Sequence, residues 1–164
     1  MTDIPRESWQ RALQALPEAQ LSEVVAGFST QWTIEPLSLP QSGLGLLKLQ
    51  ESTQGEAFYL GEFPLSDCCI RVTTESGVSA EGAARVLDDR LPRAEQLALC
   101  DAVLSARLPG WEKVALLVER GEQFRKKIAD ERNSILARTR VDFSLLDQAG
   151  EASASVTGVD CDET

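Results

Sequence analysis

Histidine is absent from this chain of 164 residues. Imidazole is the commonest general base at neutral pH and the commonest metal ligand in proteins. Its absence therefore excludes Ser–His and Cys–His catalytic pairs and every histidine-based metal site. Long hydrophobic runs are also missing: none approaches the ~20 apolar residues that span a bilayer, and the N-terminus does not resemble a secretion signal. We expect a cytoplasmic protein that makes no contact with membranes.

Positive charge is scarce, with 16 Lys and Arg residues against 26 Asp and Glu and a formal net charge of −10. A nucleic-acid footprint needs clustered positive charge, so the composition disfavours DNA and RNA as main partners. Half of the basic residues nevertheless lie between Lys113 and Arg140. A local basic surface on an acidic protein can face an acidic partner.

The few cysteines fit no zinc-binding pattern, and we expect free thiols. Cys68 and Cys100 fall on apolar faces, which indicates small buried side chains. Cys69 points outward beside Arg71, and a thiol next to a cation is a candidate nucleophile. A nucleophilic cysteine still needs a base, and no histidine is present to serve.

Length and composition predict one domain over residues 1–148, followed by an acidic and disordered tail over 149–164. The hydrophobic content of 43% is ordinary for a globular protein. The tail is rich in Ser, Ala, Gly and acidic residues, which is typical of chains that bury no core.

The start of the chain predicts a helical hairpin. Trp9 and Leu13 mark the apolar stripe of a first helix, and Leu21 and Val25 mark that of a second helix beyond Pro17. A helix-turn-helix DNA reader would also place two helices here. We favour two helices packed on a sheet, because neither helix has a basic face for phosphate contacts.

The middle of the chain predicts an antiparallel meander of short strands. We expect an edge strand with Pro36 inside it, a turn at Ser42-Gly43, a loop with Pro64 inside it, and a β-bulge at Gly82. The expected strands are Trp32–Leu39, Leu44–Gln50, Ala57–Leu60, Asp67–Thr73 and Val78–Leu87.

Two further helices are expected after the meander. The first begins near Pro92, and the second runs from Glu122 to about Arg140 with a narrow apolar stripe that includes Phe124 and Ile128. Val114–Val118 can be a strand or a helix, and Gly121 inclines us to a last strand. The predicted fold is α+β: an antiparallel β-meander sheet of four to six strands, with the N-terminal helical hairpin and the two later helices packed on it.

Candidate chemical groups are few, and we assign no catalytic, cofactor-binding or metal-binding residue. Gly43-Leu44-Gly45 lacks the lysine and hydroxyl of a nucleotide-binding loop. An acid/base pair or a magnesium site could be built from carboxylates near the last helix, but these alternate with basic residues and favour a solvated face. The carboxylates concerned are Glu119, Glu122, Asp130 and Glu131.

Two segments are candidate subunit interfaces. The basic run that contains Arg125 and Lys126 can dock on an acidic surface. The segment that follows the last helix carries anchors favoured at interfaces, and its apolar members can face another subunit or pack on this chain's own sheet. Its candidate residues are Arg140, Val141, Asp142, Phe143, Leu145 and Leu146.

Several stretches, taken in order, resemble a known family. They are Ser42-Gly43-Leu44-Gly45-Leu46-Leu47-Lys48-Leu49-Gln50, Gly61-Glu62-Phe63, Ile70-Arg71-Val72-Thr73, Ala94-Glu95-Gln96-Leu97-Ala98-Leu99-Cys100-Asp101-Ala102 and Arg140-Val141-Asp142-Phe143. Over about Ser8 to Asp147 the chain resembles the PhnG family, the G subunit of the bacterial carbon–phosphorus lyase core complex. It departs from the family after Phe143, where an aromatic and an Arg-Gly pair are usual and Ser144–Gly150 stands instead.

The resemblance implies a subunit without catalytic groups, which associates with the I, H and J subunits. With subunits I, H and L it supports displacement of adenine from ATP by methylphosphonate, giving α-D-ribose 1-methylphosphonate 5-triphosphate. ATP and methylphosphonate are then substrates of the complex, and this subunit binds no cofactor. Subunit J cleaves the carbon–phosphorus bond with an iron–sulfur cluster and S-adenosylmethionine.

Two other interpretations stay open on the sequence. One is a protein-interaction adaptor unrelated to phosphonates. The other is a small independent enzyme that uses Cys69 or carboxylates, which the missing histidine and nucleotide loop disfavour.

Overall fold

A computed structural model of the chain describes residues 4–28, 30 and 32–139. The chain divides into two compact units, residues 1–127 and 128–164. The predicted boundary between residues 148 and 149 lies outside the described residues. The described elements are α1 (Arg6–Gln14), α2 (Glu18–Ala26), β1 (Thr33–Pro36), β2 (Gln41–Gln50), β3 (Ala57–Thr73), β4 (Ser79–Val86), α3 (Leu91–Ala106) and α4 (Trp111–Arg138).

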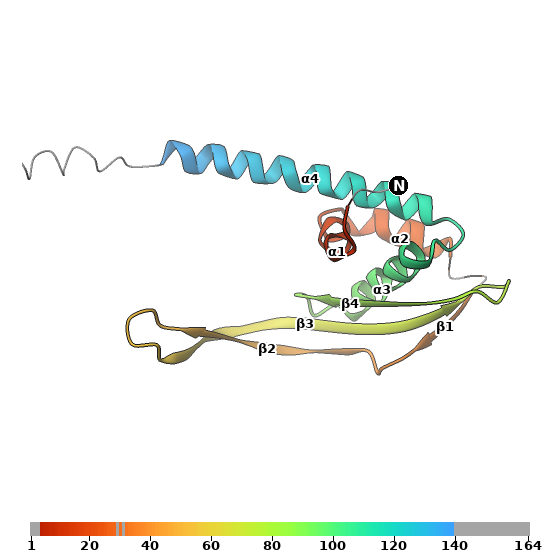
Figure 1. Cartoon of the computed structure of the whole chain (residues 1–164), viewed down its shortest axis with the longest axis horizontal. Coiled ribbons are helices and arrows are strands. Elements are labelled where there is room, and N and C mark those ends of the chain that lie inside the picture. The colour runs from red at the N-terminus through yellow and green to blue at the C-terminus, as the bar shows by residue number, and fades with distance from the viewer. Residues whose placement is uncertain (1–3, 29, 31, 140–164) are drawn as a thin grey trace, which may run out of the picture. The chain divides into compact units, whose positions relative to one another are not determined.

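The α+β prediction is confirmed. Helices α1 and α2 form the expected hairpin, and Pro5 and Pro17 occupy the residue that precedes each helix. Figure 1 shows the sheet as one layer of the first unit, with α3 lying across it and α1 and α2 on the far side of α3. Helix α3 therefore covers one face of the sheet, and α1 and α2 pack against α3.

The sheet is built around β3, and all of its pairings are antiparallel. Both β1 and β2 pair with the same edge of β3, β1 with its last residues and β2 with the rest. Strand β4 pairs with the other edge of β3, but only from Ser66 to Thr73. Residues 57–65 of β3 therefore have β2 as their only partner among the described residues (Figure 1).

The predicted loop over Gly61–Ser66 is wrong, because Ala57–Thr73 is one continuous strand. Proline lacks the N–H that a central strand needs, which led to the loop prediction. Strand β4 ends at Val86 opposite Ser66, so β3 has a free edge at Pro64 and tolerates proline there. The predicted turn at Ser42-Gly43 is also wrong, because both residues lie inside β2.

The expected bulge at Gly82 is also wrong, since β3 and β4 pair in an unbroken register from Ser66–Val86 to Thr73–Ser79. Gly82 is needed instead where α3 crosses the sheet. A Cβ added at Gly82 would lie 2.1 Å from the carbonyl oxygen of Ala98. The helix can approach β4 this closely only because the glycine has no side chain.

Val114–Val118 is helical, so the expected last strand is wrong. Gly121 suggested a break there, yet α4 runs through it. A Cβ at Gly121 would lie 2.1 Å from the carbonyl oxygen of Ala12, so the glycine allows α1 and α4 to touch backbone to backbone. Close packing between two helices outweighs the ~1 kcal/mol that glycine costs inside one of them.

The core lies between the sheet and the helices of the first unit. Cys68, Ile70 and Val72 point inward from β3 and belong to one buried cluster with Leu97 and Val103 of α3. The apolar stripe predicted on the last helix does not belong to this core, because Phe124 and Ile128 are exposed.

One buried carboxylate joins three elements of the first unit. Asp101 of α3 accepts hydrogen bonds from Arg6 Nε and Nη2 of α1, at 2.9 and 2.7 Å. It also accepts one from the backbone N–H of Ala83 in β4, at 3.1 Å. Nearby, the buried Arg93 donates to the carbonyl of Gln14 at the end of α1. These contacts satisfy buried charges and fix α1 against α3 and the sheet.

Candidate interaction surfaces

Strands β2 and β3 continue beyond the body of the sheet as a two-stranded arm. We define the arm as residues 43–65: the paired positions 43–50 and 57–65 and the connecting loop 51–56. Figure 1 shows it extending past the end of β4 and past α3. A hairpin of two strands is marginally stable alone in water, so the arm depends on the body of the sheet that it continues or on a further surface that covers it.

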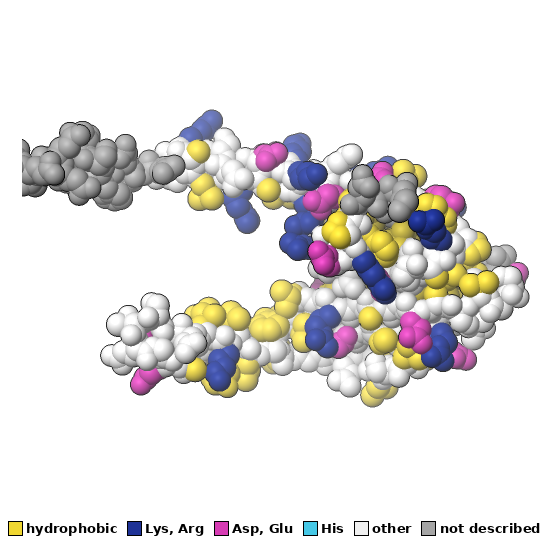
Figure 2. Space-filling model, in the orientation of Figure 1, with side chains coloured by type: hydrophobic (Ala, Val, Ile, Leu, Met, Phe, Trp, Pro, Cys, Tyr) yellow, Lys and Arg dark blue, Asp and Glu magenta, His cyan; other side chains and the backbone are white. Residues whose placement is uncertain are grey.

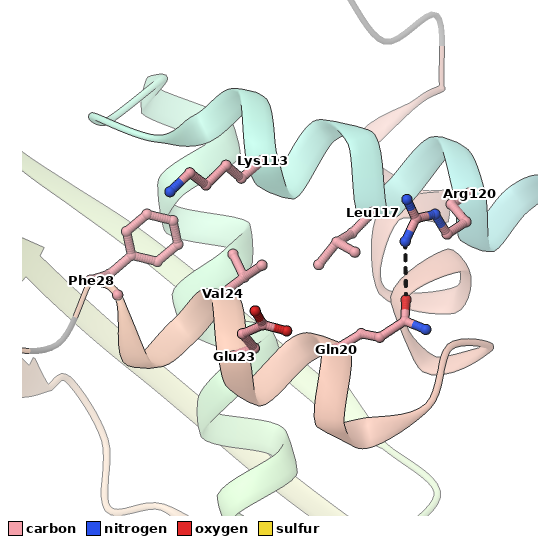
Figure 3. A pocket seen from close by; sticks show the side chains of 8 residues that line it. Gln20, Glu23, Val24, Phe28, Lys113, Leu117 and Arg120 are labelled. Carbon is pink, nitrogen blue, oxygen red and sulfur yellow. Dashed lines mark hydrogen bonds between the residues drawn. The ribbon is translucent and has the colours of Figure 1, made fainter.

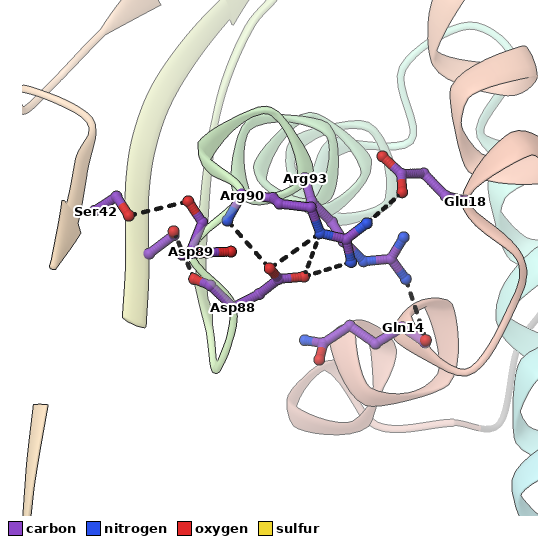
Figure 4. Close-up of polar contacts among 8 residues, drawn as sticks. Gln14, Glu18, Ser42, Asp88, Asp89, Arg90 and Arg93 are labelled. Atoms are coloured by element: carbon purple, nitrogen blue, oxygen red, sulfur yellow. Dashed lines mark hydrogen bonds and ion pairs between the residues drawn. The ribbon is translucent and has the colours of Figure 1, made fainter. Parts of the chain in front are cut away.

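The root of the arm is fixed by hydrogen bonds to the segment that leaves β4. Ser42 and Ser66 face each other across β2 and β3. The Ser42 hydroxyl donates to the carbonyl of Asp89 at 3.1 Å, and the Ser66 hydroxyl donates to that of Asp88 at 2.7 Å (Figure 4). The segment 88–90 thus crosses the sheet at this pair, and the arm begins beyond it.

An ion-pair cluster holds that crossing segment in place. The Arg90 guanidinium binds the carboxylate of Asp88 at 2.6 Å and that of Glu18 in α2 at 2.6 Å (Figure 4). Hydrogen bonding to Arg90 lowers the pKa of Asp88 to about 2. All three side chains are at least partly exposed, so the cluster positions the segment more than it stabilises the fold.

Large apolar side chains are exposed along the arm. Figure 2 shows hydrophobic atoms on both of its sides. A sheet exposed to water normally carries polar residues on the wet face, and a contiguous exposed apolar patch marks an interaction site. The residues concerned are Leu44, Leu46, Leu47, Leu49, Phe58, Tyr59 and Leu60.

The tip of the arm is polar and internally bonded. The Glu51 carboxylate accepts the backbone N–H groups of Thr53 and Gln54, at 3.0 and 2.6 Å. These hydrogen bonds lower the pKa of Glu51, and the bond from the Gln54 backbone N–H has the largest effect. Gln50 Nε2 donates to the carbonyl of Gly55 at 2.9 Å. The apolar surface therefore lies on the shaft of the arm and not at its end.

The basic run on α4 is present but partly neutralised. Arg125 Nη1 binds the Glu122 carboxylate at 2.9 Å. Lys126 is exposed, and so is Phe124, two residues earlier and on a different side of the helix. The exposed charge of Lys126 is compatible with the predicted docking role, which stays a prediction.

The second predicted interface lies outside the described residues. It comprises Arg140, Val141, Asp142, Phe143, Leu145 and Leu146. Helix α4 ends at Arg138, close to the predicted end near Arg140. The role of this segment stays a prediction.

Sequence reasoning missed a groove between α2 and α4, drawn in Figure 3. It has a volume of about 370 Å³. Lys113 and Arg120 reach it from α4, and Arg120 Nη1 donates to Gln20 Oε1 at 3.4 Å. The Glu23 carboxylate shares the groove with both cations (Figure 3). Positive charge is therefore not concentrated as a phosphate site requires.

A second, apolar groove of about 400 Å³ lies where β1 and β2 separate. Ile34 and Pro36 line it from β1, and Leu99 lines it from α3. Gln96, also in the lining, has a buried Oε1 atom without a hydrogen-bond partner. Neither groove was predicted, because each depends on how helices and strands meet and not on a sequence motif.

The thiols and carboxylates do not form a reactive centre among the described residues. Burial raises the pKa of Cys68 to about 11 and that of Cys100 to about 12. Both thiols therefore stay protonated and unreactive at neutral pH. Cys69 is half-buried, on the outer face of the sheet. Among residues 4–28, 30 and 32–139, no three acidic or thiol groups lie close enough to hold a metal ion.

No helix within the described ranges is long and apolar enough to cross a membrane. A search of curated proteins found none that matches the chain. A family model, that of the phosphonate metabolism protein PhnG, matches residues 4–148. This match includes every described helix and strand, and it extends over the Arg140–Phe143 segment. The chain therefore belongs to the PhnG family of phosphonate metabolism proteins.

Proposed function

We propose that the chain is a subunit without catalytic groups in the carbon–phosphorus lyase core complex. In this role it binds the I, H and J subunits. With I, H and L it supports the conversion of ATP and methylphosphonate to α-D-ribose 1-methylphosphonate 5-triphosphate, with release of adenine. It works in the cytoplasm and binds no cofactor of its own.

The observation that carries this proposal is the apolar surface exposed on the arm, in a chain that belongs to the PhnG family. Its exposed leucines are Leu44, Leu46, Leu47, Leu49 and Leu60. A protein that worked alone would expose these leucines to water with no gain in function, and such patches favour aggregation. The chemistry of the described residues points the same way. The thiols with raised pKa values and the lack of imidazole leave no evident nucleophile–base pair.

A reconstitution assay tests the proposal. Purified I, H and L subunits from the same organism are incubated with ATP and methylphosphonate, with and without this chain, and released adenine is measured. We expect adenine release only when the chain is present. We expect none from the chain alone, because the groups that react belong to its partners.

Two results would overturn the proposal. Full activity of I, H and L without the chain would show that the reaction does not need it. Adenine release by the purified chain alone would show that it carries catalytic groups.

The Arg140–Phe143 segment is part of the proposed interface. A Phe143→Ala variant should recover less I subunit than wild type in a pull-down, because aromatic anchors contribute strongly to interfaces. Unchanged recovery would remove this segment from the interface without affecting the proposed role of the chain.

A further inference from the structure

The outer face of the sheet changes character between the body and the arm. In the body, the face away from the helices is charged, with ion pairs between Arg71 and Glu81 and between Arg85 and Asp67. In the arm, the alternation and register of β2 and β3 place apolar residues on the same face. These are Leu47, Leu49, Phe58, Phe63 and Leu65.

The inner face changes less, but it loses its cover. In the body this face is buried, with Cys68 and Ile70 packed under α3. Beyond the Ser42–Ser66 pair the same face continues with Leu44, Leu46 and Tyr59, all of which are exposed. The surface that forms the core in the body is thus bare in the arm.

The two faces together distinguish the arm from an ordinary hairpin. Where this sheet meets water in the body, its outer face is polar, so the chain follows the usual pattern there. In the arm both faces carry large apolar side chains, and the only charges of its paired strands, Lys48 and Glu62, both fall on the inner face. A surface that covers one face only would leave the other face in water.

The polar tip bears on what covers the arm. Insertion into a membrane requires apolar or basic residues at the end that enters first, whereas this tip carries Glu51 and Glu56. Nucleic acid would be repelled by the same carboxylates. The complementary occupant is a protein surface lined with apolar side chains.

We propose that one partner protein encloses the arm in an apolar cleft that contacts both faces. The proposal rests on the proposed function, and the partner is the subunit that this chain binds in the phosphonate-processing assembly. The inner face of the arm, which carries Leu46, packs on one wall of the cleft, and the outer face, which carries Leu47, packs on the other. The polar tip then lies in water or meets polar groups beyond the cleft.

The test uses single arginine substitutions in the full chain, co-expressed with the H, I and J subunits. Leu46→Arg places a charge on the inner face, and Leu47→Arg places one on the outer face. Leu116→Arg is the matched control, because Leu116 of α4 is 62% exposed against 58% for Leu46 but lies outside the arm. Circular dichroism and thermal unfolding check that each variant folds like wild type.

We expect both arm variants to weaken binding to the co-expressed subunits by about tenfold or more, whereas Leu116→Arg binds like wild type. If wild type fails to co-purify with these subunits, the proposed function fails. If wild type binds and both arm variants bind equally well, the arm is not the docking element. If only one variant loses binding, the partner covers one face, and enclosure is overturned.

Two further readouts use the purified wild-type chain. Light scattering should give a monomer, and a dimer abolished by Leu46→Arg would show that a second copy of the chain covers the arm. Flotation with vesicles of anionic and neutral lipids should leave the chain unbound. Binding that depends on Leu46 would assign the arm to a membrane surface. Either outcome would overturn the proposal.

Discussion

At the residue scale, two glycines show how packing, and not flexibility, decides what a position can hold. Gly82 and Gly121 were interpreted from sequence as a bulge and a helix break. In the structure each is a point where another backbone comes within reach of a missing Cβ. Sequence alone does not say which backbone approaches, so this role could not be predicted.

Gly121→Ala should destabilise the protein by about 1–3 kcal/mol. The new Cβ would lie 2.1 Å from the Ala12 carbonyl oxygen, and backbone cannot move aside as a side chain can. This cost exceeds the ~1 kcal/mol that alanine gains over glycine in a helix. Denaturant unfolding of both proteins measures the difference.

Gly61→Ala is the control, because a Cβ there meets no atom within 4 Å. It should leave stability unchanged or raise it by up to ~1 kcal/mol. Equal stability of Gly121→Ala and wild type would contradict the close contact between α1 and α4.

The buried thiol of Cys100 makes a prediction about alkaline pH. Its pKa is raised to about 12 by burial, whereas an exposed thiol in the unfolded chain ionises near pH 8.5. Between these values the unfolded state loses a proton that the folded state keeps. The contribution to stability is therefore complete below about pH 8.5 and declines as pH rises toward 12, by up to ~1.4 kcal/mol per pH unit.

Cys100→Ala removes this titration. Denaturant unfolding measured from pH 8 to 10.5 should show a shallower decline for Cys100→Ala than for wild type. Parallel declines would mean that the thiol is not shielded from water. The burial of this residue was predicted from its position on an apolar helix face, since periodicity carries that information.

At the scale of elements, the sequence predicted the first three helices, the second half of α4 and the edge strand, but it divided β3 into two pieces. Glycine and proline are typical of loops, so the segment that contains Gly61 and Pro64 was predicted to be a loop. The strand tolerates them because the neighbouring strand β4 ends at Val86, opposite Ser66, which is a property of the sheet and not of the local sequence. Val114–Val118 was misassigned for a similar reason, because short apolar runs fit a strand or a buried helix.

Asp101 is the residue that ties α1, α3 and β4 together, and Asp101→Asn should cost about 1–3 kcal/mol. The amide retains one acceptor but loses the charge that binds Arg6 and can no longer satisfy all three donors. Thermal and denaturant unfolding measure the loss.

Glu81→Gln provides the comparison, because the Arg71–Glu81 pair on the outer face of the sheet is exposed on both sides. Its loss should change stability by no more than ~0.5 kcal/mol. Equal losses of stability in the two variants would contradict a larger contribution from the buried hydrogen bonds of Asp101 than from the exposed Arg71–Glu81 pair.

At the scale of the whole molecule, the family assignment came from the order of several weak motifs, whereas the arm was not foreseen. A signal was present: Leu44, Leu46, Leu47 and Leu49 occupy both alternating positions of one expected strand. A half-buried strand in a meander shows one apolar face only. The predicted interface beyond Arg138 lies outside the described residues, so its merit rests on the pull-down proposed above.

The family places the chain in phosphonate metabolism, which sets aside an adaptor unrelated to phosphonates. The small-enzyme interpretation gains no support from the described residues. Cys69 lies on the outer face of the sheet, and its neighbour Arg71 is paired with Glu81. The distinguishing feature of the molecule is the exposed apolar surface of the arm, residues 43–65.

Hydrogen exchange of the chain, free and co-purified with the proposed partner subunits H, I and J, tests most directly whether the arm is an interaction surface. In the free chain, backbone amides of residues 43–50 and 57–65 should exchange much faster than those of 66–73, because the outer edges of the arm have no strand partner among the described residues and its large apolar side chains are exposed. In the complex, the arm should gain the largest protection of any described segment. Equal exchange of the arm in both states, with protection appearing elsewhere, would contradict the account.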